Sequence, residues 1–198
     1  RLGSGVGLAA GVPHNNYSPP PPSRVLGYFN LAPNTGGTHN RHTDACIYSP
    51  GVIICKTDDA IPERLEEKDF VTVDVITCAA PNLRSAPSNW HNPETGKPIK
   101  MDSQELYALH VKRAKHILQV AAANEADILI LGAFGCGAFQ NDPDIVAKAY
   151  RKALEDYRNS FDSIVFAIYC SGRDKANFEA FEKVLGKQAE SGIPGART

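Results

Sequence analysis

The sequence predicts a three-layer α/β/α fold with a mostly parallel central sheet. Apolar, β-branched runs alternate with amphipathic helical patterns between residues 71 and 185. The resulting order (strand, helix, strand, helix, strand, helix) is typical of a parallel sheet with helices on both faces. Composition agrees, because 42% hydrophobic and 22% charged residues in a chain of 198 supply enough apolar material for one core.

The chain divides into three predicted parts. Residues 1–43 are predicted to be an irregular Gly/Pro-rich arm, because the four prolines Pro19–Pro22 cannot continue a helix or pair as a central strand. Residues 44–187 form the predicted domain, and residues 188–198 a flexible C-terminal tail. Glycines at 3, 5 and 7 follow no strand, so a flexible terminus is favoured there over a nucleotide-binding loop.

Two strand regions open the domain. Residues 46–55 are apolar and β-branched, with a turn signal at Pro50-Gly51 that is expected to interrupt the strand. Residues 71–78 carry β-branched side chains on both faces, as in a sheet that is covered on both sides. Pro81 ends this strand, and residues 84–101 form a predicted loop.

A long amphipathic helix is predicted over residues 104–124, with Ser103 as its N-cap. Its solvated face is predicted to carry Lys112, Arg113 and Lys115. The apolar stripe comprises Leu106, Leu109, Ile117, Leu118 and Ala121.

The second half repeats the alternation. Strands are predicted at residues 128–134 and 163–169. Between them, either Asn141 or Asp142 caps a helix that has Pro143 in its first turn and runs to about residue 157. A closing helix contains residues 177–185. Its predicted core-facing side chains are Phe178, Phe181, Val184 and Leu185.

The glycine-rich segment 131–143, LGAFGCGAFQNDP, leaves a predicted buried strand and enters a capped helix. Gly132, Gly135 and Gly137 allow unusual dihedrals and close approach of a ligand to the backbone. Free N–H groups and a helix N-terminus attract anions, phosphate above all. Phe134 and Phe139 add flat apolar walls, which favour a nucleotide diphosphate over free phosphate.

A tight strand-to-helix turn packed by two phenylalanines is the alternative interpretation of this segment. The preceding strand and following helix favour binding. The segment is not a Walker loop, because no Gly-Lys-Ser/Thr follows, and it lacks the dinucleotide Gly-x-Gly-x-x-Gly order.

The same segment closely resembles the diphosphate- and ribose-binding loop of the microbial-type poly(ADP-ribose) glycohydrolases, a branch of the macrodomains. Three further stretches match in the right order: IYSPGV at 47–52, VDVITCAAPN at 73–82 and IVFAIYCSGRDKANFEAF at 164–181. The resemblance implies a macrodomain-like fold. It also implies a hydrolase, a glycosidase that cleaves ribose-ribose O-glycosidic bonds of poly(ADP-ribose) to release ADP-ribose.

The resemblance also implies which residues bind ADP-ribose. Gly135, Cys136 and Gly137 would present backbone N–H groups to the phosphates, and Phe139 would pack against the ribose nearest the scissile bond. The whole predicted binding set is Gly132, Ala133, Phe134, Gly135, Cys136, Gly137, Ala138, Phe139, Tyr169, Ser171 and Asn177, the last three at the adenosine end. For Tyr169 and Asn177, strand-end packing and a capping or turn hydrogen bond are equally good interpretations.

The catalytic residue stays unassigned. The resembled glycohydrolases use a Gly-Gly-Gly loop and a Gln-Glu-Glu motif upstream of IYSPGV, where a glutamic acid protonates the leaving group. No Gln-Glu-Glu occurs here; Asn34-Thr35-Gly36-Gly37 resembles the glycine loop only faintly, and Glu66-Glu67 fits a solvated face. Either the chain, which begins at Arg1 rather than Met, is a fragment, or the domain is a catalytically inactive ADP-ribose binder. A third class is an α/β protein for a different nucleotide.

Other features limit the remaining possibilities. The net charge of −1 argues against direct nucleic-acid binding, and no run is long enough to cross a membrane. The partners that the resemblance implies are ADP-ribose, poly(ADP-ribose) and ADP-ribosylated proteins, with no cofactor. Five cysteines without a zinc or redox spacing indicate a cytoplasmic or nuclear protein. Cys136 has no histidine partner nearby and is disfavoured as a nucleophile. His39 and His42 are interpreted as surface histidines, so no metal site is predicted among the six histidines.

Overall fold

The computed structural model describes residues 40–87, 97–157, 159–170 and 174–186. The arm and the tail predicted at the two ends lie almost wholly outside these residues, so the division into three parts stays a prediction. The described elements are β1 (Cys46–Ile54), β2 (Val71–Cys78), α1 (Ser103–Ala123), β3 (Ile128–Leu131), α2 (Pro143–Leu154), β4 (Ser163–Phe166) and α3 (Ala176–Leu185). Two single 3-10 turns, Glu67–Asp69 and Glu155–Tyr157, complete the set.

Strands β1 and β2 form an antiparallel pair with a bulge. Pairing runs from Cys46 opposite Cys78 to Ile54 opposite Val71, and the register shifts between Ser49 and Val52. The predicted turn at Pro50-Gly51 is therefore wrong, because the strand continues through it. The left-handed φ of Gly51, +67°, accommodates the one extra residue on β1 instead.

Strands β3 and β4 form a separate parallel pair, from Ile128 opposite Ser163 to Leu131 opposite Phe166. Both strands end three residues earlier than predicted. The described strands thus form two two-stranded sheets, and the single, mostly parallel sheet is not confirmed. A cavity of about 550 Å³, lined by residues of both β2 and β3, separates the facing edges of these two strands.

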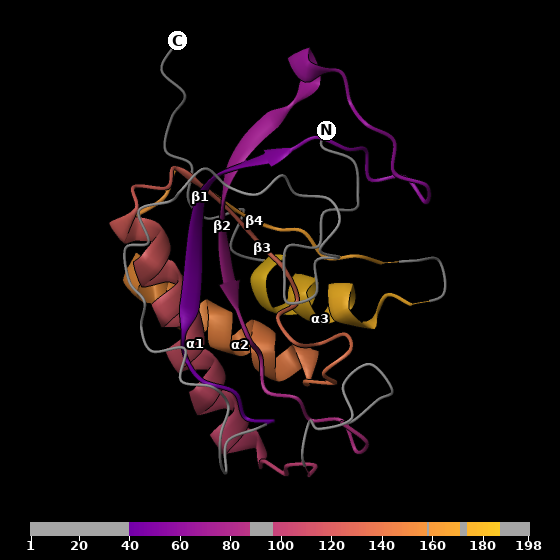
Figure 1. Cartoon of the computed structure of the whole chain (residues 1–198). Coiled ribbons are helices and arrows are strands. Elements are labelled where there is room, and N and C mark those ends of the chain that lie inside the picture. Colours follow the sequence, from indigo (N-terminus) through magenta and orange to yellow (C-terminus); the bar gives the residue numbers. More distant parts are fainter. Residues whose placement is uncertain (1–39, 88–96, 158, 171–173, 187–198) are drawn as a thin grey trace.

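The three helices pack side by side in the order α1, α2, α3 (Figure 1). They cover the face of β3 that carries Leu129 and Leu131, both buried in the main core. On the opposite face Ile128 is 63% exposed, and Val165 of β4 is 47% exposed. Among the described residues, the predicted helices on both faces are therefore not confirmed. The chain is nonetheless a mixed α/β structure, as predicted.

The helix termini refine the predicted caps. Asp102, not Ser103, is the N-cap of α1; its carboxylate accepts from the N–H groups of Gln104 and Glu105 in a reciprocal capping box. For α2 the structure selects Asp142 over Asn141 as the N-cap.

Two side chains differ from their predicted environment. Arg113 is only 3% exposed rather than solvated, and Phe178 is 40% exposed rather than in the core. In α3 the buried stripe is formed by Ala180, Phe181 and Val184, and Phe178 lies beside that stripe. Leu185 packs partly buried against the core, as predicted. No helix in the described part of the chain is long and apolar enough to span a membrane.

Candidate functional site

The carboxyl ends of β2, β3 and β4 converge on the glycine-rich loop. Leu83, beyond β2, donates its N–H to the carbonyl of Phe139 in the loop (3.0 Å). Ala167, just beyond β4, donates to the carbonyl of Leu131 (2.7 Å). The loop after β3 therefore lies between the segments that follow β2 and β4. All three segments lie at the carboxyl ends of their strands, which is where ligands bind in α/β sheets.

The glycines of this loop serve different purposes. Gly135 has a φ of +77°, and a Cβ there would lie 2.5 Å from the Cβ of Ala80 and 2.7 Å from Nδ2 of Asn141. The atoms that approach the backbone closely at Gly135 therefore belong to the protein, to Ala80 and Asn141, and not to a ligand as predicted. Gly137 is exposed, and a Cβ there would meet nothing within 4 Å. Space for a ligand is thus found at Gly137.

The backbone N–H groups of the loop are partly used within it. Cys136 donates to the carbonyl of Ala133 (3.0 Å), so this predicted phosphate donor already has a partner. The N–H groups of Gly137 and Ala138, both exposed residues, donate to no other described residue. These two amides are the loop's best candidate donors to an anion.

The N-terminus of α2 contributes less to anion binding than its position predicts. The carboxylate of Asp142 accepts from the N–H groups of Asp144 (2.9 Å) and Ile145 (3.2 Å). These first-turn N–H groups therefore already have a negatively charged acceptor, the carboxylate of Asp142. A phosphate would depend on the loop amides rather than on this helix dipole.

The two phenylalanines have separate environments. Phe134 is 4% exposed and packs edge-on against His110, with ring centroids 5.9 Å apart. Phe139 is half-buried at the loop surface and stacks on His42 (5.7 Å between centroids, 26° between planes). His42 is therefore not a simple surface histidine, and burial, reinforced by the charge of Arg113, lowers its pKa. Phe139 is the aromatic ring placed to meet a ligand.

Arg113 holds the segment before β1 against α1. Its guanidinium donates to Asp44 Oδ1 (3.1 Å) and to the carbonyls of Ala79 (3.1 Å), Arg41 (2.7 Å) and His42 (2.9 Å). Burial lowers the pKa of Arg113, whereas its ion pair with Asp44 opposes this. By fixing the backbone of His42, Arg113 positions the ring on which Phe139 stacks.

His110 is buried beneath the loop. It is 2% exposed, and its Nε2 lies 2.9 Å from Oδ1 of Asn141. Burial lowers its pKa from 6.5 to about 4, since the charged imidazolium is disfavoured away from water; the charge of Arg113 acts in the same direction, and the hydrogen bond to Asn141 opposes it. His110 is therefore neutral at physiological pH.

This pKa predicts a pH dependence of stability. Between pH 6.5 and about 4 the unfolded chain binds a proton at position 110 that the folded chain does not, so the stabilisation is complete above pH 6.5 and is lost as pH falls. We expect the free energy of unfolding to drop on the order of 2 kcal/mol from pH 7 to pH 5 through this group. Urea unfolding of wild type and His110→Gln at both pH values measures it. His42 is present in both proteins, so its contribution to the pH dependence cancels in the comparison. If the free energy of unfolding of His110→Gln fell by as much as that of wild type, the drop could not be assigned to His110.

The remaining predicted site residues are spread more widely. Tyr169 is 76% exposed, three residues beyond β4, and Asn177 is half-buried in the first turn of α3. Ser171 lies outside the described residues.

Burial raises the pKa of the Cys136 thiol to about 12, which agrees with the expectation that Cys136 is not a nucleophile. Within the described residues, no group of three or more His, Cys, Asp or Glu side chains is placed to hold a metal ion.

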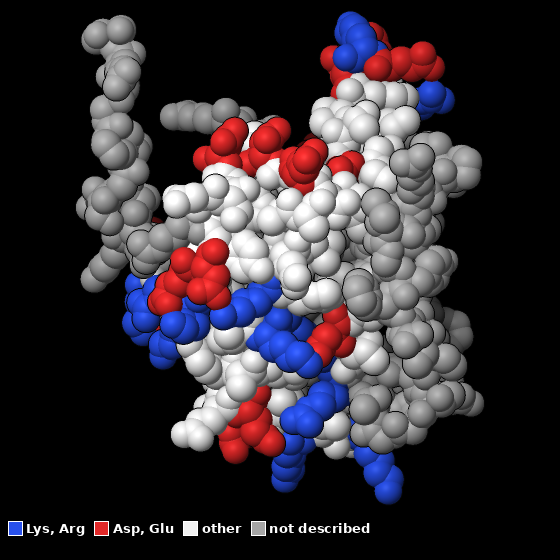
Figure 2. Space-filling view, turned by 90° about the vertical axis from the view of Figure 1, so that its left-hand side faces the viewer, with Lys and Arg blue, Asp and Glu red and all other residues white. Residues whose placement is uncertain are grey.

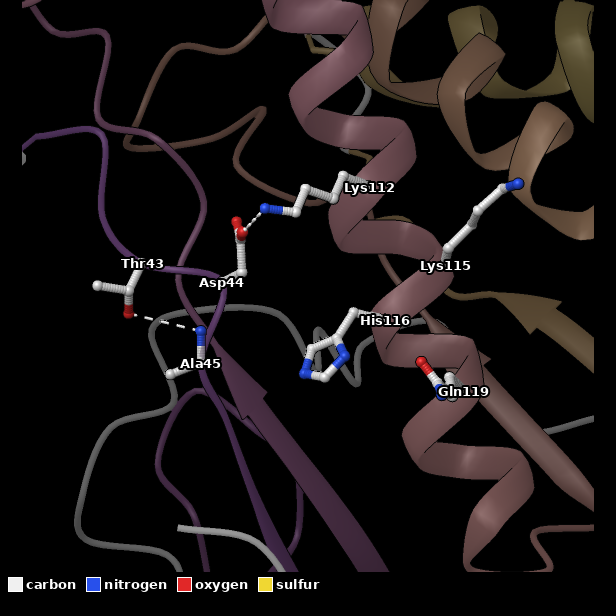
Figure 3. A pocket seen from close by; sticks show the side chains of 7 residues that line it. All are labelled: Thr43, Asp44, Ala45, Lys112, Lys115, His116 and Gln119. Carbon is white, nitrogen blue, oxygen red and sulfur yellow. Dashed lines mark hydrogen bonds and ion pairs between the residues drawn. The ribbon is translucent and has the colours of Figure 1, made fainter. Parts of the chain in front are cut away.

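A second pocket, of about 470 Å³, lies between α1 and the segment before β1 (Figure 3). It is lined by Thr43, Asp44, Ala45, Lys112, Lys115, His116 and Gln119. Its cations already have partners: Lys112 pairs with Asp44 and Lys115 with Asp156, both at 2.5 Å. On the face seen in Figure 2, lysine and arginine side chains lie beside acidic ones, so this face presents no uniform basic surface.

The site defines a class of protein: an α/β domain whose exposed glycine-rich loop lies at the carboxyl ends of its strands. No protein-family model and no curated protein matches the chain. Among solved structures it is similar to poly(ADP-ribose) glycohydrolase from Deinococcus radiodurans in complex with ADP-ribose (31% identity, TM-score 0.61, 75% of this chain and 55% of that chain). It is also similar to the apo form of that enzyme (31% identity, TM-score 0.61, 78% and 57%).

A third similar structure is the poly(ADP-ribose) glycohydrolase from Thermomonospora curvata (29% identity, TM-score 0.61, 74% of this chain and 49% of that chain). This chain therefore has the fold of the microbial-type poly(ADP-ribose) glycohydrolases, as its motifs predicted. It spans about half the length of these solved chains.

Proposed function

We propose that this chain is the ADP-ribose-binding part of a poly(ADP-ribose) glycohydrolase. One observation carries the proposal: the exposed residues Gly137 and Ala138, with the half-buried Phe139 beside them, lie at the carboxyl edge of a fold whose similar structures include an enzyme in complex with ADP-ribose. The partners would be poly(ADP-ribose), free ADP-ribose and ADP-ribosylated proteins. The five free cysteines support a cytoplasmic or nuclear location.

Within the site, we assign the loop roles from accessibility and the adenosine-end roles from the resemblance of the motifs. The amides of Gly137 and Ala138 bind the diphosphate, with Gly135 holding the loop in shape below them. Phe139, backed by His42, packs against the ribose nearest the scissile bond. Tyr169, Ser171 and Asn177 serve the adenosine end, and Gly132, Ala133, Phe134 and Cys136 shape the loop beneath the ligand.

Hydrolysis of the ribose-ribose bond requires a positioned acid, and we assign this role to no residue of the chain. The full protein's activity is therefore proposed from the fold and the loop together. The alternative, a catalytically inactive ADP-ribose binder, rests on the absence of Gln-Glu-Glu from the sequence. Incubation of the full protein with poly(ADP-ribose) separates the two: released ADP-ribose supports the hydrolase, and binding without release supports the inactive binder.

Binding itself is tested by calorimetric titration of the chain with ADP-ribose, comparing Gly137→Glu with Gly137→Gln. Both side chains enter open space, since a Cβ at Gly137 meets nothing within 4 Å, so folding should be unaffected. We expect the glutamate to weaken binding at least tenfold more than the glutamine, because only the glutamate places a negative charge beside the diphosphate. No heat from folded wild type, or equal affinities of the two variants, would argue against a diphosphate at this position.

A further inference from the structure

Asn141 is a buried junction between four parts of the chain. It is 2% exposed. Its Nδ2 lies within hydrogen-bond distance of the carbonyls of Pro81 (2.8 Å), Gly135 (2.9 Å) and Phe139 (3.3 Å). Its Oδ1 faces Nε2 of His110 on α1. One side chain therefore connects the segment after β2, both ends of the glycine-rich loop, and the long helix.

The partners of Asn141 determine its orientation. A carboxamide has two N–H donors, and three carbonyl oxygens compete for them, so the nitrogen must point to the carbonyls and the oxygen to His110. Oδ1 can only accept, which means that Nε2 of His110 carries the hydrogen. Because His110 is also neutral, its Nδ1 is unprotonated, and a single tautomer is required.

Capping of α2 does not explain Asn141. Asp142 supplies the cap by accepting from the first-turn amides, whereas the amide nitrogen of Asn141 points away from the helix, to the carbonyls of Pro81, Gly135 and Phe139. The two loop carbonyls that it holds, those of Gly135 and Phe139, bracket the exposed amides of Gly137 and Ala138. Fixing both ends of so short a loop limits the directions in which these amides can point.

We propose that Asn141 is the positioning residue of the ADP-ribose loop, and that His110, as the Nε2–H tautomer, locks it in orientation. This inference rests on the proposed function, because the amides it positions are those assigned to the diphosphate. Neither residue touches the ligand. Both act by holding Gly137 and Ala138 in the arrangement that binds the ligand. The loop then loses little conformational entropy on binding, and the affinity is higher for that reason.

The first test is a long-range proton–nitrogen NMR spectrum of the wild-type chain labelled at histidine. The His110 pattern should be that of an Nε2–H imidazole with Nδ1 unprotonated at neutral pH. A Nδ1–H pattern, or a protonated ring, would overturn the proposed lock regardless of any ligand.

The second test compares affinity for ADP-ribose with stability in matched variants. His110→Gln keeps an N–H near the position of Nε2, whereas His110→Met leaves Oδ1 of Asn141 buried without a donor. We expect His110→Gln to bind within about threefold of wild type and His110→Met at least tenfold more weakly, a difference of about 1.4 kcal/mol or more. Asn141→Ala should weaken binding at least as much as His110→Met.

Leu118→Ala is the stability control. Leu118 is fully buried in α1, and its apolar side chain has no part in the hydrogen bonds that hold the loop. It should lower the melting temperature yet keep the affinity. Wild-type affinity in Asn141→Ala and His110→Met, or an equal loss in Leu118→Ala, would overturn the positioning role while leaving the proposed function intact. If Asn141→Ala does not fold, the two His110 variants decide. Wild type that does not bind ADP-ribose overturns the proposed function and this inference together.

Discussion

Replacement of Arg113 by methionine is expected to lower the free energy of unfolding by about 3–5 kcal/mol. The change removes a buried cation and leaves the carbonyls of Arg41, His42 and Ala79 without their donor. Methionine preserves most of the side-chain volume, so the loss reports hydrogen bonds and charge rather than a cavity. Urea unfolding followed by circular dichroism measures it.

Lys112→Met is the matched control for this prediction. Lys112 pairs with the same Asp44, but its side chain is 71% exposed, so we expect a loss below about 1 kcal/mol. Similar losses in the two variants would mean that Arg113 is solvated after all. Because Arg113 also fixes the backbone of His42, the arginine variant should in addition weaken ADP-ribose binding through the His42–Phe139 stack.

The Gly135→Ala variant should lose about 2–5 kcal/mol of stability. Alanine at a φ of +77° is strained, and its Cβ would lie 2.5 Å from the Cβ of Ala80 and 2.7 Å from Nδ2 of Asn141. Since Asn141 must move to admit the methyl group, the hydrogen bonds that hold the loop should break as well. Thermal unfolding and ADP-ribose titration of the same variant should therefore both show a large effect.

Two comparisons make the Gly135 prediction specific. Gly137→Ala, two residues along in open space, should change stability by less than about 0.5 kcal/mol. Adding Ala80→Gly to Gly135→Ala removes one of the two clashing partners and should recover part of the loss. If the double variant is no more stable than the sum of the two single changes predicts, the contact between these residues is not the source of strain.

Both predictions point to the same feature of the site: residues other than those assigned to the ligand hold the glycine-rich loop in shape. Arg113 and His110 come from α1, Ala80 and Pro81 follow β2, and Asn141 precedes α2. The loop's exposed residues, Gly137 and Ala138, are those whose amides we propose bind the diphosphate. Changes at Arg113 or Gly135 are expected to affect stability and binding together, whereas changes at Gly137, in open space, test binding with stability held constant.

The sequence by itself determined much of the local structure and predicted the glycine-rich loop as the candidate site. The three helices, the strand at residues 71–78 and the starts of the strands at residues 128 and 163 follow from periodicity, which depends on neighbours in the chain. Capping chemistry placed the start of the second helix at Asn141 or Asp142, and the structure selects Asp142. The loop and its family resemblance came from contiguous motifs, and the solved structures confirm the fold that the motifs implied. The assignment of individual residues to ADP-ribose stays a prediction.

The tertiary structure alone decided which groups meet across the chain. His110 and Arg113 occupy the stripe of α1 that also carries Leu106 and Ile117, at spacings of four, three and four residues. That spacing is the signal that could have revealed their burial, yet charge suggested solvent for Arg113. An arginine can be buried when carbonyls from distant segments converge on it, and Asn141 can hold a loop when three carbonyls face it. Such convergence, like the pairing of strands into two sheets, depends on contacts between segments far apart in sequence, which no local pattern encodes.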